Sequence, residues 1–96
     1  MLAIAFDLLV AAADEHHPDG CRQAYADIAS TLGRLGFDQL QASLYTTQND
    51  DLVNLYNAVA ALKALPWFPP AVGEVRGFKI DLWSDFTPLL KSDQPE

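Results

Sequence analysis

The chain has 96 residues, of which 50% are apolar and 20% are charged, and its formal net charge is −7. This composition excludes an intrinsically disordered chain and predicts one globular domain, which we place at residues 1–90, with a polar tail at residues 91–96. The acidic charge argues against indiscriminate coating of nucleic acid. Because only six Lys and Arg residues are present, and these are scattered, any phosphate-binding surface must be small.

The expected compartment is the cytoplasm. A single cysteine, Cys21, allows no disulfide within the chain, which favours a reducing environment. The apolar N-terminal run has no basic segment before it and contains Asp7, so it predicts neither a signal peptide nor a membrane span.

The first predicted element is a strand in the apolar run at residues 3–9. The run shows no alternation, which is typical of a strand buried on both faces, although a buried helix can have the same pattern. The polar segment after it favours the strand. Asp7 lies near its end, where burying an unpaired carboxylate costs on the order of several kcal/mol. Asp7 is therefore either a structural acceptor or a functional group.

A loop is predicted at residues 11–20, which end in Pro-Asp-Gly. His16 and His17 offer metal ligands, but adjacent histidines point in different directions and no third ligand lies nearby. Solvated loop histidines are the favoured interpretation. Cys21 follows in a first helical turn, where the helix dipole lowers a thiol pKa, but a small half-buried residue is the simpler interpretation.

A first amphipathic helix is predicted at residues 21–35, because its apolar side chains recur on one stripe. Either Asp14 or Asp19 can cap its start. Gly36 lies where a left-handed residue ends a helix.

Strand-like alternation follows at residues 37–47. The acidic segment 49–51 then offers caps for a second amphipathic helix, which Pro66 ends. The Pro pair at residues 69–70 predicts irregular structure. Trp67 and Phe68 are expected to close the end of the core, although an aromatic pair can also stack on bases.

The last predicted strand covers residues 75–82, with Arg76 on one face and Lys79 on the other. The aromatic segment 83–87 after it suggests a tail that packs on a second subunit.

The order strand, helix, strand, helix, strand predicts an α+β fold with both helices on one face of a small sheet. Because the first strand is apolar on both faces, its second face needs a cover. The simplest cover is the same face of a symmetric partner, which predicts a homodimer formed sheet to sheet.

Four segments in register carry a family resemblance: residues 3–8, residues 36–45, residues 61–69 and residues 75–87. Together they resemble the virulence-associated protein D (VapD) family over residues 2 to about 90. The resemblance implies a ferredoxin-like fold, like that of the small nucleases of CRISPR adaptation systems, in which residues 37–47 supply two strands. It also implies an endoribonuclease that acts as the toxin of a toxin–antitoxin pair, with RNA as substrate and a protein antitoxin as partner.

The resemblance gives Asp7 a catalytic role, because a dimer would present two such carboxylates to one phosphodiester. They would hold Mg²⁺, or Asp7 would act without metal as a base on the ribose 2′-OH. Ser43 is implied as a donor to phosphate. The candidates for substrate binding are Arg76, Lys79 and Tyr45.

The chain departs from the family pattern near the last strand, with Gly73 and Glu74 where Arg and Asp are common, and with Ala42 in place of a Gly. Glu74 is a carboxylate that could assist the site. The competing hypothesis is a non-catalytic dimeric module that binds a protein partner through its aromatic tail and acidic surface.

Overall fold

The computed structural model describes residues 1–92 and shows a four-stranded antiparallel sheet with the strand order β2-β3-β1-β4. The strands are β1 (Leu2–Leu8), β2 (Asp38–Gln41), β3 (Leu44–Thr47) and β4 (Val72–Lys79). The longer helices are α1 (Val10–His16), α2 (Gly20–Gly33) and α3 (Leu52–Lys63), and the short ones are α4 (Phe68–Ala71) and α5 (Thr87–Leu90). The predicted α+β class, with a central first strand, is confirmed.

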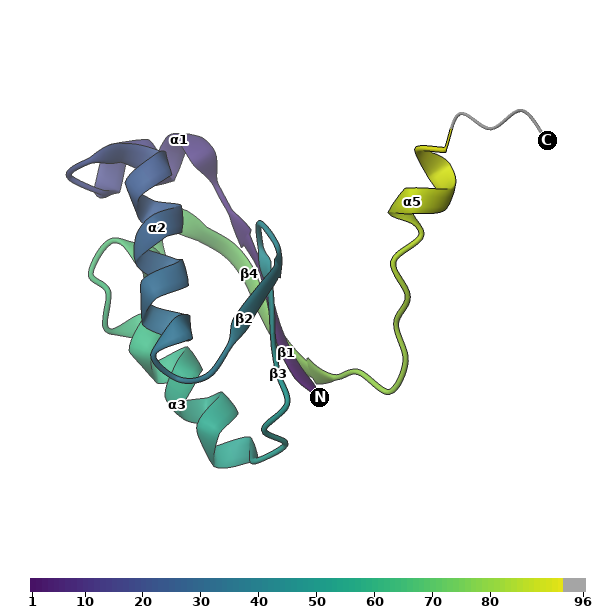
Figure 1. Ribbon diagram of the computed structural model, residues 1–96. Coiled ribbons are helices and arrows are strands. Elements are labelled where there is room, and N and C mark those ends of the chain that lie inside the picture. Colours follow the sequence, from purple (N-terminus) through teal and green to yellow (C-terminus); the bar gives the residue numbers. More distant parts are fainter. Residues whose placement is uncertain (93–96) are drawn as a thin grey trace.

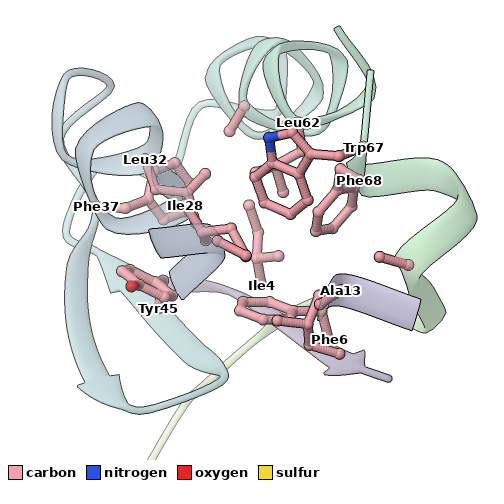
Figure 2. Close-up of a cluster of buried hydrophobic side chains, with 14 residues drawn as sticks. Ile4, Phe6, Ala13, Ile28, Leu32, Phe37, Tyr45, Leu62, Trp67 and Phe68 are labelled. Carbon is pink, nitrogen blue, oxygen red and sulfur yellow. The ribbon is translucent and has the colours of Figure 1, made fainter. Parts of the chain in front are cut away.

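Helices α2 and α3 pack on one face of the sheet, and the core lies between them and β1 (Figures 1 and 2). Alternate residues of β1, among them Ile4 and Phe6, point into this core. Trp67 and Phe68 are buried at its end, as Figure 2 shows, so the core interpretation of this pair is confirmed.

The other face of the sheet carries no helix in Figure 1. On β1 this face presents Ala3, Ala5 and Asp7, which are buried, half-buried and exposed in that order. Ala3 is paired with Phe78 of β4, and Phe78 is 42% exposed. Small residues and one exposed aromatic ring therefore form the centre of an open face.

The residues predicted to begin and end the first amphipathic helix, α2, are confirmed in part. Gly36 has a φ of 85°, which is the left-handed conformation expected of it. Of the two capping candidates for α2, Asp14 is the acceptor: its Oδ1 receives the Cys21 N–H at 2.7 Å, whereas Asp19 makes no side-chain cap bond. At α3, Asp51 Oδ1 accepts the Val53 N–H at 2.9 Å.

Two predictions of irregular structure were wrong. Most of the expected loop at 11–20 is the helix α1, because its alanines are strong helix formers and Ala13 is fully buried. Residues 69–70 lie in the helical turn α4, where proline is tolerated because first-turn N–H groups have no helical partner.

The last strand begins and ends three residues earlier than predicted. Its start is fixed by β1, since Leu8 pairs with Val72 and the Leu9 N–H donates to the Ala71 carbonyl at 2.9 Å. The apolar stripe from which the second amphipathic helix, α3, was predicted includes Leu52, Tyr56 and Leu62, and it is confirmed only in part. Leu62 is buried, together with Ala58, whereas Leu52 and Tyr56 are 69% and 75% exposed.

A C-terminal arm, residues 80–90, leaves the sheet after β4 and stands away from the body in Figure 1. Apart from the half-buried Ile80, its large apolar side chains are exposed, with Leu82 at 88% and Phe86 at 64%. The radius of gyration is 15.2 Å, above the value of about 13 Å typical of a 100-residue domain. The arm accounts for this extension. Of the predicted polar tail, residues 93–96 lie outside the described residues.

Candidate active site

Asp7 lies at an irregularity in the pairing of β1 with β4. Phe6 pairs with Val75 and Leu8 with Val72, so the single residue Asp7 faces two residues of β4, Gly73 and Glu74. Two residues opposite one is the pattern of a β-bulge, which changes the direction of side chains and is frequent beside active sites. The Asp7 side chain points to the open face and is exposed. Within residues 1–92, no hydrogen bond or ion pair of its carboxylate is present.

A shallow pocket of about 210 Å³ surrounds this carboxylate. It is lined by Ala5, Phe6, Asp7, Glu74 and Arg76. The Arg76 guanidinium forms an ion pair with Glu74 two residues before it, and both side chains are mostly exposed. Exposed pairs of this kind contribute little to stability, about 0–1 kcal/mol, so Arg76 can exchange its partner at small cost. The structure therefore brings together three of the predicted site residues.

Ser43 lies at the edge of the same region. It occupies the turn between β2 and β3, and its carbonyl accepts the Phe6 N–H at 3.1 Å. This bond places Ser43 beside the residue that precedes Asp7. Its side chain is half-buried, and Ser43 is not among the residues that line the pocket.

Tyr45 is directed to the opposite side of the sheet. It pairs with Ile4, is 1% exposed, and its ring stacks on Phe6 at a centroid distance of 6.2 Å (Figure 2). Its buried hydroxyl has no hydrogen-bond partner among the described residues, and burial raises the pKa of that hydroxyl. The structure makes Tyr45 a core residue and does not bring it to the Asp7 pocket.

Lys79 is also separate from Asp7. It pairs with Leu2 at the other end of β1 and lies on the helix-bearing face, near Asp50. The charge of Lys79 contributes to lowering the pKa of Asp50, after the larger effect of the hydrogen bond to the N-terminal ammonium. Arg76 is therefore the one predicted cation in the lining of the Asp7 pocket.

The residues of one chain do not form a complete cation site. Among residues 1–92, no group of three or more His, Cys, Asp or Glu side chains is placed to hold a metal ion. Glu74 is engaged by Arg76, which leaves Asp7 as the unengaged carboxylate of the pocket. Mg²⁺ usually keeps several of its waters and is held by one or two carboxylates, and among the described residues of this pocket Asp7 offers one.

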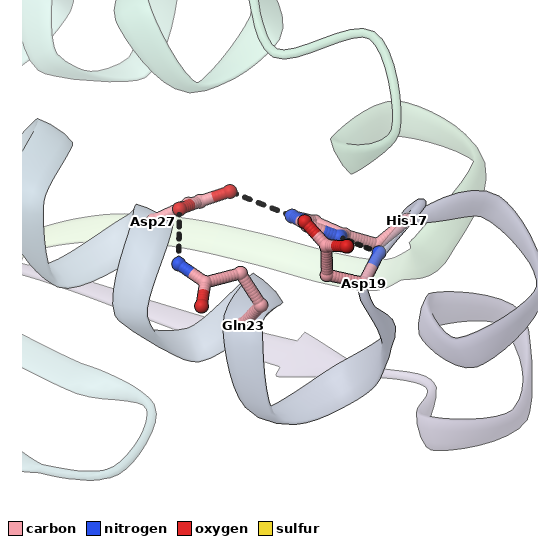
Figure 3. Close-up of polar contacts among 4 residues, drawn as sticks. All are labelled: His17, Asp19, Gln23 and Asp27. Carbon is pink, nitrogen blue, oxygen red and sulfur yellow. Dashed lines mark hydrogen bonds and ion pairs between the residues drawn. The ribbon is translucent and has the colours of Figure 1, made fainter.

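A second polar cluster, which sequence reasoning missed, surrounds His17 (Figure 3). The prediction that His17 is solvated was wrong: it is 5% exposed and contacts Trp67 with the ring centroids 4.9 Å apart. Its Nδ1 accepts the Asp19 N–H at 2.9 Å, so the neutral ring carries its proton on Nε2, which lies 2.6 Å from Asp27 Oδ2. His16, by contrast, is exposed as predicted.

The same cluster holds Asp27 in its charged form. The hydrogen bond with His17 is the main cause that lowers the pKa of Asp27, and a second bond from Gln23 Nε2 at 3.0 Å adds to it. Both nitrogens of His17 are thus engaged in structural bonds. Cys21 is half-buried, as the simpler interpretation predicted. In the sequence, His17 and Asp27 are ten residues apart. This spacing does not correspond to a helix or strand period, so it did not predict their contact.

No helix within residues 1–92 combines the length and apolar character that a membrane crossing requires.

Comparisons with known proteins identify the relatives of this chain. No family model matches it. The chain is 56% identical over 92 residues to the "Endoribonuclease VapD homolog" of Neisseria gonorrhoeae, an alignment that covers 96% of this chain and 100% of that protein. It is 45% identical to "Endoribonuclease VapD" of Haemophilus influenzae, with the same coverage, and 37% identical to that of Dichelobacter nodosus over 95% of this chain and 98% of the relative. The chain therefore belongs to the VapD family.

Proposed function

We propose that this chain is an endoribonuclease that cleaves RNA phosphodiester bonds at the Asp7 pocket, and that it is the toxin of a toxin–antitoxin pair. The names of its relatives support the activity. The observation that carries the choice of site is the convergence of Asp7, Glu74 and Arg76, from two neighbouring strands, on one exposed pocket. With one half-buried cysteine in the chain, we propose the cytoplasm as its compartment.

The proposed chemistry uses the carboxylate of Asp7 as a general base. It takes the proton of a ribose 2′-OH, and the 2′-oxygen attacks the adjacent phosphorus while the 5′-oxygen leaves and is protonated by water. Arg76 binds the non-bridging phosphate oxygens after it exchanges Glu74 for the substrate, because a guanidinium pairs with phosphate in a bidentate geometry. The Ser43 hydroxyl donates a further hydrogen bond to the phosphate.

We further propose that the active form is a homodimer with a ferredoxin-like protomer. The alternation of strands and helices and the strand order β2-β3-β1-β4 support the protomer fold. The open sheet face and the exposed apolar arm support an association that covers both. Such a dimer would supply a second Asp7, and two carboxylates together offer oxygen ligands of the kind that Mg²⁺ binds.

Cleavage of labelled single-stranded RNA tests the proposal. Asp7→Asn keeps the shape of the side chain but removes its charge, so we expect kcat to fall about 100-fold or more, the usual contribution of a positioned base. Arg76→Gln should instead raise KM several-fold and weaken the salt dependence of binding. Both variants should unfold at the temperature of the wild type, because both side chains are exposed.

Parallel reactions with Mg²⁺ and with a chelator distinguish the metal-free reaction from one that uses two Asp7 carboxylates. Cleavage that survives in Asp7→Asn would contradict the assignment of the site. RNA binding or protein binding without any cleavage would favour the non-catalytic module, for which the exposed arm is the supporting observation.

A further inference from the structure

A second pocket on the molecule lies between the C-terminal arm and strand β2. It has a volume of about 260 Å³ and is lined by residues of the arm and of β2, namely Trp83, Ser84, Asp85, Thr87, Leu40 and Gln41. We call it the arm pocket. Its lining combines a large aromatic ring with side chains that donate and accept hydrogen bonds, which suits a planar polar ligand.

The groups that line the arm pocket are available to a ligand. Trp83 is 46% exposed, whereas Trp67 is 7% exposed and belongs to the core. Within residues 1–92, no hydrogen bond of the Gln41 side chain is present. Asp85 Oδ1 accepts the Thr87 N–H at 2.9 Å, and hydrogen bonding with Thr87 lowers the pKa of Asp85. Its carboxylate is therefore charged at neutral pH, and it retains acceptor capacity beyond the bond to Thr87.

Strand pairing places the arm pocket on the same sheet face as the Asp7 pocket. Gln41 pairs with Leu44, and Leu44 pairs with Ala5. Residues paired in this way point to one face, and Ala5 lines the Asp7 pocket. Because neighbouring strands are about 4.8 Å apart, Gln41 and Ala5 are separated by roughly 10 Å. Neighbouring nucleotides of one RNA strand can span this distance.

We propose that the arm pocket binds a nucleobase of the RNA strand whose phosphate lies at the Asp7 pocket. The Trp83 ring stacks on the base, and Gln41 and Asp85 form hydrogen bonds with its edge. Since the charged Asp85 only accepts hydrogen bonds, it favours a base with an amino donor, such as cytosine, over uracil. The inference rests on the proposed function, because it takes RNA as the substrate.

The proposed homodimer is compatible with an accessible arm pocket. Strand β2 is the outer strand beyond β3, whereas the centre of the open face lies on β1 and β4. An association centred on Ala3 and Phe78 places β2 at its rim, which is the polar and accessible part of an interface. The most exposed apolar side chains of the arm, Leu82, Leu89 and Leu90, do not line the pocket and stay available for the association.

Tryptophan fluorescence tests the arm pocket without cleavage. A short oligocytidylate is added to the full-length Asp7→Asn protein, and we expect it to quench the exposed Trp83. The quenching should disappear when Trp83→Phe is added, because the remaining Trp67 is buried. Quenching of equal size in that double variant would place the effect elsewhere and overturn the proposal.

The same assay tests the contact with the edge of the base. Oligocytidylate should bind several-fold more tightly than oligouridylate of equal length, because cytosine offers an amino group where uracil has a carbonyl. Asp85→Asn should reduce this difference. Equal affinities for the two oligonucleotides before that substitution would overturn the assignment of Asp85.

Cleavage of labelled single-stranded RNA connects the arm pocket with the substrate. Trp83→Ala should raise KM about tenfold and leave kcat within about twofold of the wild type, since stacking holds the substrate and the transition state alike. Gln41→Ala, a second variant outside the arm, should raise KM about threefold.

Leu82→Ala is the matched control on the arm. Leu82 is 88% exposed and does not line the arm pocket, so KM should stay unchanged. An equal rise of KM in Leu82→Ala would show that the arm acts through association of the chain, and would overturn the proposal.

The two levels of the argument fail separately. If the wild type does not cleave RNA, the proposed function is overturned, while the quenching and its dependence on Trp83 still report on the arm pocket. If Asp7→Asn abolishes cleavage but neither Trp83→Ala nor Gln41→Ala changes KM, the arm pocket is overturned and the proposed function stands.

Discussion

The Asp7 pocket and the His17 cluster each contain carboxylates and a nitrogen-bearing side chain, Arg76 in the pocket and His17 in the cluster, but the polar groups are engaged differently. In the pocket, Asp7 is exposed and unengaged, and Arg76 is held by Glu74 in a surface pair. In the cluster, both ring nitrogens of His17 and both oxygens of Asp27 have partners (Figure 3).

This difference separates a site for chemistry from a structural link. A group with free hydrogen-bonding capacity on an open surface can receive a substrate. A group whose polar atoms are all partnered, and whose ring is packed on Trp67, would lose those bonds to do so. The cluster instead ties the α1–α2 connection to α2 and to the segment before α4. The comparison predicts that changes in the pocket affect activity and changes in the cluster affect stability.

The largest expected effect on stability is that of His17→Ala. The substitution leaves the Asp19 N–H and one Asp27 oxygen without their partner and opens a cavity beside Trp67, which should cost about 2 kcal/mol. For a domain of this size the melting temperature should fall by about 10 °C. RNA cleavage by the folded variant should stay close to that of the wild type. A large loss of kcat with an unchanged melting temperature would contradict the structural role assigned to His17.

The next largest effect is a pH dependence of the free energy of unfolding, caused by Asp27. Because the folded protein lowers the pKa of Asp27 below its ordinary value of 3.8, the pair contributes stability above that value and loses it as the pH falls through the lower, folded-state pKa. The free energy of unfolding should therefore be higher in the wild type than in Asp27→Asn above pH 4. The difference should shrink in more acidic solution. Denaturant titrations between pH 6 and pH 2 would measure it, and a difference that does not change with pH would contradict the assignment.

The smallest expected effect is that of Tyr45→Phe, which tests whether Tyr45 belongs to the core or to the RNA-binding site. The Tyr45 hydroxyl is buried without a partner among the described residues, so its removal should leave the melting temperature unchanged or raise it slightly. Because the ring lies on the core side of the sheet, kcat and KM should also be unchanged. A raised KM for RNA would show that the hydroxyl is accessible to substrate after all.

Local patterns in the sequence determined most of the elements. The caps at Asp14 and Asp51, the left-handed Gly36 and the apolar stripe of α2 are signals carried within a few residues of one another. The central position of β1 was also predicted from its unbroken apolar run, although the structure leaves the second face of this strand open. The family resemblance, carried by four segments in register, predicted the endoribonuclease activity.

The tertiary structure alone decided which candidates share a site. Alternation within β4 already separated Arg76 from Lys79, but only the pairing of β4 with β1, through its bulge, placed Arg76, Glu74 and Gly73 around Asp7. In the same way, His17 is buried only by tertiary contacts, with Asp27 of α2 and with the ring of Trp67. Strand pairing and helix packing bring together residues that are far apart in the chain. The surroundings of Asp7 and His17 are therefore made by other segments, and local sequence patterns could not predict them.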